Sequence, residues 1–319
     1  MACFRSQKIH NYFQIKNGFI LSLVLPIASI SIVGIILIYV LINTILRKII
    51  YIPHIPNTKT PNDFSITFDE HFLKTESTKK IQLWDLNPNS EKTIILAVHG
   101  WSRSADSLLP LLAGINNEAH VFVLNTRNHG KSDSEKDLSI AKYKDDIKIA
   151  IEFIKNKNKN EDIILLGHSF GAATVLEMGH LDNSVSGLIL LSLFADGEKL
   201  IRRQFEQKKI PKQLIDSLVK SIEFKNGEKL SRVAPKDIIG QVKIPILMIH
   251  GKKDKSVSEN DFNDLKMQLN EDSKAIILEH EDHVSVLDNN KASSEISIFI
   301  KDQFESEFIF NPAFLKKVD

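Results

Sequence analysis

The sequence has little cysteine and no excess of charge of either sign. Cys3 is its single cysteine, so no disulfide can form within the chain, and thiol usage does not indicate a redox compartment. The 41 Lys and Arg residues stand against 40 Asp and Glu residues, a balance that does not favour a nucleic-acid partner. The eleven histidines form neither an HExxH pair nor a Cys/His cluster, and no glycine-rich phosphate loop is present. The sequence therefore predicts no metal, no cofactor and no nucleic-acid partner.

Charge is missing altogether from residues 17–46, which form one long apolar run. About 20 apolar residues suffice to cross a bilayer, so we expect the middle of the run, about 19–41, to be the spanning part. The run is too long for a signal peptide, shows no clear cleavage site, and lacks the polar stripe of a core helix. Three basic residues lie on either side of it, so the positive-inside rule leaves the orientation open.

These features predict a single-pass membrane protein with the globular part on an unassigned side of the membrane. The expected order is an N-terminal tail at 1–16, a transmembrane helix at 17–46, a proline-containing stalk at 47–63 and a globular domain at 64–319. The oligomeric state stays open.

The pattern of the domain changes from alternating to continuous apolar residues. Phe64, Ile66 and Phe68, and later Ile81 and Leu83, alternate with polar residues, which predicts two antiparallel edge strands. Short continuous apolar runs, typical of strands buried on both faces, follow at 93–98, 121–124, 163–166, 188–193, 244–249 and 275–278. Stretches with helical apolar spacing lie between or after them, at 107–115, 138–154, 172–178, 261–269 and 292–304. This alternation predicts an α/β fold with a mainly parallel sheet and helices on both faces.

Residues 195–240 interrupt the alternation with mostly helical patterning. We expect them to form a small cap inserted over the carboxyl edge of the sheet. The insertion carries eleven Lys and Arg residues against seven Asp and Glu residues. A solvated helical surface and attraction to an anionic membrane both remain open as readings of this charge.

A sharp turn with a serine at its centre follows the run at 163–166. The pentapeptide Gly167-His168-Ser169-Phe170-Gly171 lies between this expected strand and an expected helix, which is the context that a G-x-S-x-G nucleophile turn requires. Small residues at Gly167 and Gly171 let the strand and the helix approach closely. An ordinary strand-to-helix turn is the alternative, and the context favours Ser169 as a nucleophile.

GHSFG (167–171), VHGW (98–101), RNHGKSD (127–133) and IHGKKD (249–254) together resemble the α/β-hydrolase superfamily in order and spacing. The resemblance covers residues 64–305 and is specific for the fold rather than for a substrate. Many relatives have Asp at the end of the strand before the RNHG-like run, where this chain has Asn125. That position is usually structural.

The resemblance implies partners for Ser169 in the order acid, then histidine. His283 follows the last expected strand and is favoured as the general base, with His280 as its rival. Asp254 is favoured as the acid that orients the imidazole, and Asp196 is the alternative acid.

The resemblance also implies an oxyanion hole formed by two backbone N–H groups. One is that of Phe170, the residue after the nucleophile, and the other that of Trp101 in the HGW loop. The Trp101 indole is a candidate wall of the acyl pocket. His99, His129 and His168 are expected to be structural.

The expected function is that of a serine hydrolase of the esterase or lipase type, which cleaves a carboxylic ester through an acyl-enzyme. A membrane anchor fits an acyl-lipid or thioester substrate. Acyl transfer and aminopeptidase activity would use the same three residues and stay open, while epoxide and haloalkane hydrolysis are disfavoured because their nucleophile is Asp. A non-catalytic, membrane-anchored binding module is the alternative from another class.

Overall fold

The computed structural model describes residues 25–26, 28–45, 53–135, 139–158 and 162–305 of the chain. The chain divides into two units, Met1–Ile50 and Tyr51–Asp319. Among the described residues, the one helix that is long and apolar enough to cross a bilayer is Ala28–Ile45. The predicted tail at 1–16, the predicted transmembrane positions 17–24, 27 and 46, and the stalk residues 47–52 lie outside the described part.

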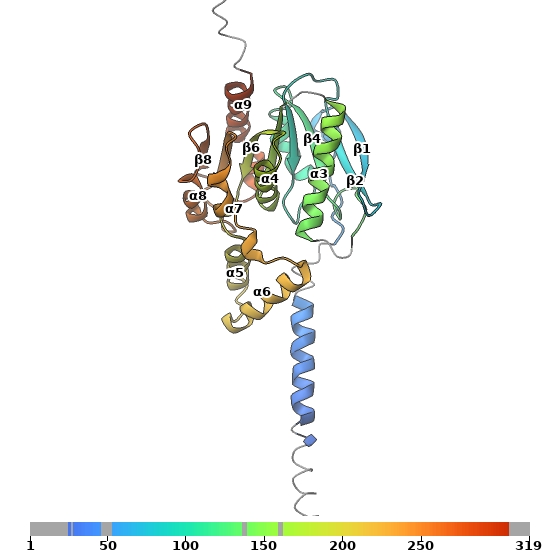
Figure 1. The fold of residues 1–319 in the computed structure, drawn as a ribbon, viewed down its shortest axis with the longest axis vertical. Coiled ribbons are helices and arrows are strands. Elements are labelled where there is room, and N and C mark those ends of the chain that lie inside the picture. Colours follow the sequence, from blue (N-terminus) through green and yellow to red (C-terminus); the bar gives the residue numbers. More distant parts are fainter. Residues whose placement is uncertain (1–24, 27, 46–52, 136–138, 159–161, 306–319) are drawn as a thin grey trace, which may run out of the picture. The chain divides into compact units, whose positions relative to one another are not determined.

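One eight-stranded sheet organises the described residues of the second unit, in the order β1-β2-β4-β3-β5-β6-β7-β8 (Figure 1). Its β1–β2 and β2–β4 pairs are antiparallel, and every other pair is parallel. The strands are β1 Phe68–Lys74, β2 Lys80–Leu86, β3 Ile94–Val98, β4 His120–Asn125, β5 Ile163–His168, β6 Val185–Leu191, β7 Ile246–Gly251 and β8 Lys274–Leu278. The predicted α/β class and mainly parallel sheet are therefore confirmed.

The first edge strand begins later in the chain than its alternating pattern predicted. Phe64 lies in a short 3-10 helix, η1 Pro61–Phe64, and β1 starts at Phe68. Pro at the first helical position and a capping box between Thr60 and Asp63 favour this turn. Local capping thus outweighs the two-residue alternation at Phe64 and Ile66.

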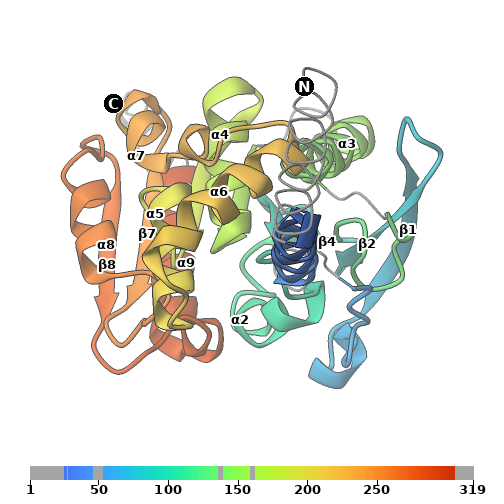
Figure 2. The same cartoon turned by 90° about the horizontal axis from the view of Figure 1, so that it is seen from below.

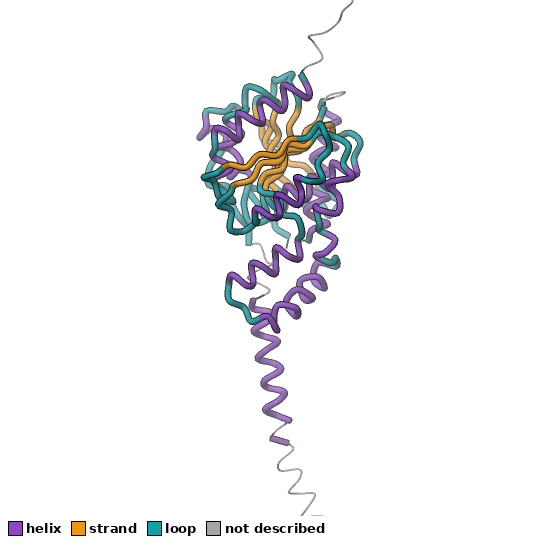
Figure 3. The backbone as a smooth tube through the Cα atoms, turned by 90° about the vertical axis from the view of Figure 1, so that its left-hand side faces the viewer, coloured by secondary structure: helices purple, strands orange, loops and turns teal. Residues whose placement is uncertain are grey.

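Helices cover both faces of the sheet, as Figure 3 shows with the sheet seen nearly edge-on. One face packs against α3, α4 and α8, and the other against α2 and α9. The helices of these two layers are α2 Leu109–Ala113, preceded by η2 Ala105–Leu108, then α3 Ile140–Lys157, α4 Phe170–Leu181, α8 Glu259–Lys266 and α9 Asn290–Phe304, preceded by η5 Ser285–Asp288. Both faces exclude water, which explains why the central strands are apolar along their whole length.

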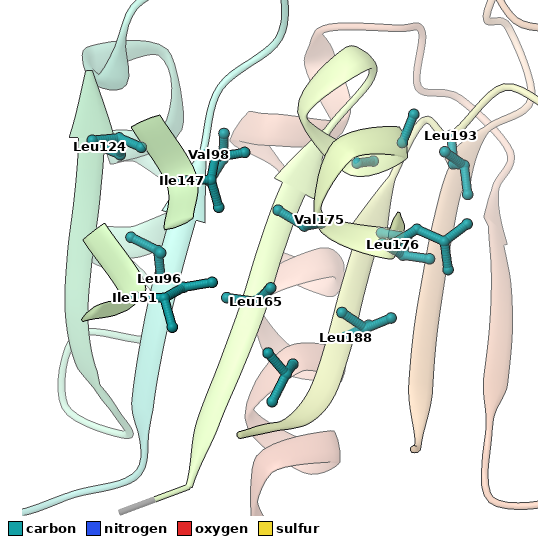
Figure 4. Close-up of a cluster of buried hydrophobic side chains, with 14 of the residues drawn as sticks. Leu96, Val98, Leu124, Ile147, Ile151, Leu165, Val175, Leu176, Leu188 and Leu193 are labelled. Carbon is teal, nitrogen blue, oxygen red and sulfur yellow. The ribbon is translucent and has the colours of Figure 1, made fainter. Parts of the chain in front are cut away.

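Alternate residues of one strand supply the two layers of the core. Leu96 and Val98 of β3 point into the layer that Leu165 of β5 and Val175 of α4 also enter (Figure 4). Ile95 and Ala97 of β3 enter the opposite layer. Truncating such a fully buried Leu to Ala typically costs about 2–5 kcal/mol, so β3 anchors both layers and the loop that follows it.

The predicted insertion at 195–240 contains α5 Gly197–Gln207, α6 Lys212–Asn226, η3 Leu230–Arg232 and α7 Pro235–Ile238, and it ends within η4 Ile239–Gln241. Helix α5 packs against α6 and η3. The two longer helices lie beyond the ends of the strands, and Figure 2, seen from that side, shows them in front of the sheet. Phe205 of α5 and Leu218 of α6 are buried, so each of the two helices has an apolar face that is covered from water.

Candidate active site

Ser169 lies on a sharp turn between β5 and α4. Its backbone has φ 54° and ψ −116°, a conformation that non-glycine residues rarely adopt and that costs on the order of 1–3 kcal/mol. A Cβ at Gly167 would lie 2.5 Å from the Gly171 carbonyl oxygen, and a Cβ at Gly171 would lie 2.5 Å from the His99 carbonyl oxygen. Both glycines are thus required for the close approach of strand, helix and neighbouring loop that holds Ser169 in this turn.

The structure brings Ser169, His283 and Asp254 together from three separate segments. His283 Nε2 is 3.0 Å from Ser169 Oγ, and His283 Nδ1 is 2.6 Å from Asp254 Oδ2. The second carboxylate oxygen, Asp254 Oδ1, accepts hydrogen bonds from the N–H groups of Ser256 and Val257 at 2.7 and 2.8 Å. The Asp254 side chain is fully buried and that of His283 is 21% exposed, so the imidazole remains open toward solvent.

Two residues that the sequence did not single out for this role hold the loop of His283. His168 Nε2 lies 2.7 Å from the His283 carbonyl oxygen, and the two rings are 5.0 Å apart. Burial, followed by the proximity of His283, lowers the pKa of His168 to about 3, so its ring is neutral and donates from Nε2. A Cβ at Gly251 would lie 2.5 Å from the Glu281 carbonyl oxygen, so only glycine lets this loop pack on the end of β7.

The two predicted oxyanion donors flank Ser169. A Cβ built on Gly100 would be 3.5 Å from Ser169 Cβ, which places the HGW loop beside the serine. The Gly100 carbonyl accepts from His99 Nδ1 at 2.8 Å and from the Arg103 N–H at 3.1 Å. Because N–H and C=O point in opposite directions across a trans peptide, these bonds aim the Trp101 N–H away from them.

The Phe170 N–H is oriented in the same way, by the hydrogen bond of the carbonyl on the other side of its peptide. The Ser169 carbonyl accepts from the Ala173 N–H at 3.1 Å, within the first turn of α4, so the Phe170 N–H points out of the helix start. Within the described part of the chain, the N–H groups of Trp101 and Phe170 have no acceptor. Both N–H groups are thus unengaged hydrogen-bond donors near Ser169.

Aromatic side chains pack around the HGW loop. The ring of Trp101 meets that of Phe170 edge-on at 4.8 Å, and the ring of Tyr143 lies 5.2 Å from that of Phe170. The Tyr143 hydroxyl donates to the His99 carbonyl. Tyr143 was not predicted as a site residue. Its place in the α3 periodicity indicates a buried position, but not this hydrogen bond.

The rival residues lie elsewhere. Asp196 caps α5 by accepting from the Lys199 N–H at 3.1 Å and pairs with Lys236 Nζ at 2.6 Å, and it has no hydrogen bond to His283. Burial opposes ionisation of Asp196, but the Lys236 ammonium, followed by the backbone hydrogen bond from Lys199, holds its pKa below the ordinary value. His280 is exposed just past the end of β8. Among the described residues, no group of three His, Cys, Asp or Glu is arranged to hold a metal ion.

Comparison with known proteins supports the fold that this geometry suggests. Residues 93–208 match the model of a family described as having the alpha/beta hydrolase fold. An esterase from Pyrococcus furiosus superposes with a TM-score of 0.65 at 20% identity, covering 79% of this chain and 97% of that one. A membrane phospholipase A described as a bacterial virulence factor superposes with a TM-score of 0.57 at 15% identity, covering 89% and 98%.

A similar sequence is found in protein phosphatase methylesterase 1 of Candida albicans, which is 29% identical over 129 residues. The match covers 40% of this chain and 36% of the methylesterase, so the chain spans about a third of that relative. By the family model and these superpositions, the chain has the fold of the α/β-hydrolase class. Its elbow residue is a serine rather than an aspartate, as in the serine-dependent members of that class.

Proposed function

We propose that this chain is a serine hydrolase that cleaves a carboxylic ester through an acyl-enzyme intermediate. The observation that carries the proposal is the continuous hydrogen-bonded path from Ser169 Oγ to His283 Nε2 and from His283 Nδ1 to Asp254 Oδ2. A serine hydroxyl is a weak nucleophile until a positioned base accepts its proton. The path supplies that base and an acid that fixes its tautomer.

In the acylation step, Ser169 Oγ attacks the carbonyl carbon of the ester while its proton passes to His283 Nε2. The Asp254 carboxylate stabilises the imidazolium that forms, because it accepts the remaining N–H at 2.6 Å. The electron pair of the carbonyl moves to the oxyanion, which the N–H groups of Trp101 and Phe170 stabilise. Donors of this kind are worth about 2.7–4 kcal/mol each.

The tetrahedral intermediate then breaks the bond to the leaving alcohol, which takes the proton from His283. In deacylation, His283 accepts a proton from water as the water oxygen attacks the acyl carbon. Collapse of the second tetrahedral intermediate returns that proton to Ser169 Oγ and releases the carboxylic acid. His283 thus acts as base and as acid in each half-reaction, and its side chain, 21% exposed, remains accessible to water.

An ester substrate is supported by the relatives and by the apolar helix. The superposed proteins include an esterase and a membrane phospholipase A, and the sequence relative is a methylesterase. We propose that the helix Ala28–Ile45 is a retained membrane anchor at the head of the chain. It would hold the domain near lipid-borne acyl esters or thioesters, with 64–319 as the catalytic domain and 195–240 as its cap.

The test is hydrolysis of p-nitrophenyl esters of graded acyl length by the full chain in detergent micelles. Ser169→Ala is the comparison, because it removes one hydroxyl and leaves the turn in place. Wild type should turn over at least one ester, and the variant should lose nearly all of that rate. Equal rates for the two proteins would contradict the proposal.

The same assay separates the remaining activities. Adding a primary alcohol as acceptor detects acyl transfer as a new ester product, and proline p-nitroanilide detects aminopeptidase activity. A wild-type protein that is inert toward every substrate and also fails to react with a fluorophosphonate would favour the binding module.

A further inference from the structure

Residues 53–60, which the sequence placed in the stalk, are hydrogen-bonded to the domain; we call them the strap. The Ile55 N–H donates to the Asn128 carbonyl at 2.8 Å, and the Gly130 N–H donates to the Ile55 carbonyl at 2.8 Å. His54 Nε2 lies 2.8 Å from the Gly130 carbonyl. Ile55 therefore forms a parallel bridge with His129, the residue between these two partners.

The other end of the strap is attached to η2, which begins just after the HGW loop. The N–H and the hydroxyl of Thr58 both donate to Asp106 Oδ2 at 2.7 Å, and the Lys59 N–H donates to the same oxygen at 3.1 Å. Ser104 Oγ donates to Asp106 Oδ1 at 2.6 Å. One carboxylate thus joins the strap to the residues that follow the HGW loop.

His129 connects the strap to Trp101. His129 Nε2 is 3.1 Å from the Trp101 carbonyl, while Nδ1 is 3.0 Å from Thr126 Oγ1 and 2.8 Å from the Arg127 carbonyl. Burial lowers the pKa of His129, so the neutral ring carries one proton and can donate to only one of the two carbonyls. Whichever ring nitrogen carries the proton, the buried imidazole lies between the Trp101 carbonyl on one side and the Thr126 hydroxyl and Arg127 carbonyl on the other, and so fixes their separation.

The strap is therefore bonded to two neighbours of the HGW loop, the loop of His129, which packs on Trp101, and Asp106 in η2. We propose that the strap is a positioning element of the oxyanion hole, and that its contacts keep the Trp101 N–H aligned with the oxyanion. The inference rests on the proposed function. It adds that a segment upstream of the whole α/β fold sets the rate of the chemical step. A misalignment of about 1 Å in such a site can reduce the rate as much as 100-fold.

The experiment compares Asp106→Ala with a matched control, Asp182→Ala, in the full chain in detergent. Asp182 also accepts from a backbone N–H and a hydroxyl, both of Ser184, but lies at the end of α4 away from the strap. With p-nitrophenyl butyrate as substrate, Asp106→Ala should lower kcat about 10- to 100-fold and change KM less than about 2-fold. Its affinity for a trifluoromethyl ketone, whose adduct carries an oxyanion, should fall by a similar factor.

A merely structural role predicts a different pattern. In that case Asp106→Ala would lower the melting temperature and leave kcat per folded molecule at the value of Asp182→Ala, which would overturn the inference. Thr58→Val and His54→Ala provide milder tests if Asp106→Ala does not fold. Each should lower kcat about 2- to 5-fold with KM unchanged, since Thr58→Val removes one hydrogen bond and His54→Ala two, while the other bonds of the strap remain. Unchanged kcat in both would also overturn it.

The experiment distinguishes failure of the proposal about the strap from failure of the proposed function. An active wild type with an unaffected Asp106→Ala variant contradicts only the strap. A wild type that neither turns over esters nor reacts with a fluorophosphonate contradicts the hydrolase proposal and the strap with it.

Discussion

Two aspartate–histidine pairs in the described part of the domain have nearly equal nitrogen–oxygen distances, and only one of them adjoins a serine hydroxyl. Asp254 and His283 are joined at 2.6 Å, and Asp85 and His120 at 2.7 Å. Both aspartate side chains are fully buried. The pairing alone therefore does not define a site.

The surroundings of the two histidines differ. The second nitrogen of His283 faces Ser169 Oγ, and the ring is 21% exposed, whereas His120 is 1% exposed and its Nδ1 has no partner among the described residues. Asp85 also binds Lys157, so its charge is neutralised within a packed cluster. Asp254 follows the carboxyl end of β7, where α/β sheets place their ligands, while His120 begins β4 at the opposite edge.

Removing the carboxylate of each pair gives the largest contrast. Asp254→Asn should lower kcat about 10,000-fold with little loss of stability, because the amide disfavours the required tautomer of His283. Asp85→Asn should leave kcat per folded molecule unchanged and lower the free energy of unfolding by about 2 kcal/mol, because it weakens charge-assisted hydrogen bonds. Steady-state ester hydrolysis and urea denaturation measure the two effects. A large loss of kcat in Asp85→Asn, with little loss in Asp254→Asn, would contradict the comparison.

A glycine beneath the loop of His283 provides the second test. Gly251→Ala forces a Cβ to within 2.5 Å of the Glu281 carbonyl oxygen, so the loop must shift and move His283 away from Ser169. We expect a loss in kcat of about 100-fold. Gly240→Ala is the control, since its Cβ would come no closer than 3.4 Å to Gln268, an ordinary van der Waals contact. Equal activity of the two variants would show that the close approach at Gly251 does not position the base.

The fold of the elbow could be predicted from the sequence, but the support of the base could not. The motif GHSFG predicts its own turn, because the strand, the small residues, the serine and the helix are adjacent in the chain. Gly251 and His168 contact the His283 loop from positions 32 and 115 residues away. No local pattern encodes such contacts, because they depend on how strand ends meet across the sheet.

Local sequence patterns did not predict the contacts of the strap either. Three prolines between residues 53 and 61 indicated a stalk, yet the backbone of Ile55 pairs with the loop of His129. Backbone hydrogen bonds of an isolated bridge leave no side-chain signature. Conversely, the apolar runs predicted the six parallel strands, β3 to β8, to within a few residues. Five of them lie inside the sheet, where burial on both faces dictates their composition.

The pH dependence of stability tests the neutral state of His168. Its pKa is about 3 in the folded protein and about 6.5 when unfolded, so the stabilisation is complete above pH 6.5 and is lost as the pH falls toward 3. The contribution of Asp146 to stability depends on pH in the opposite direction. Burial raises its pKa to about 6, so its contribution to stability is lost as the pH rises through that value.

A variant isolates the His168 contribution from that of Asp146. Between pH 7 and pH 5, His168→Gln should lose less unfolding free energy than wild type, by about 1 to 2 kcal/mol. Urea denaturation at the two pH values measures the difference, and parallel losses would contradict a neutral buried ring.

The smallest effect is expected at the alternative acid. Asp196→Asn keeps a good helix-capping side chain and loses one partly exposed ion pair with Lys236, so stability should fall by less than about 1 kcal/mol. Because Asp196 does not bond to His283, kcat should stay within about 2-fold of wild type. A loss of kcat comparable to that of Asp254→Asn would contradict the assignment of Asp254, rather than Asp196, as the acid that orients His283.

The most direct test of the central claim, that His283 activates Ser169, is the rate of reaction with a fluorophosphonate followed by mass spectrometry of peptides. The full-length wild type should gain one adduct on the peptide that contains Ser169. His120→Ala should react at the wild-type rate per folded molecule, and His283→Ala should react at least about 1000-fold more slowly. A wild type that forms no adduct, or a His283→Ala variant that reacts as fast as wild type, would contradict the account.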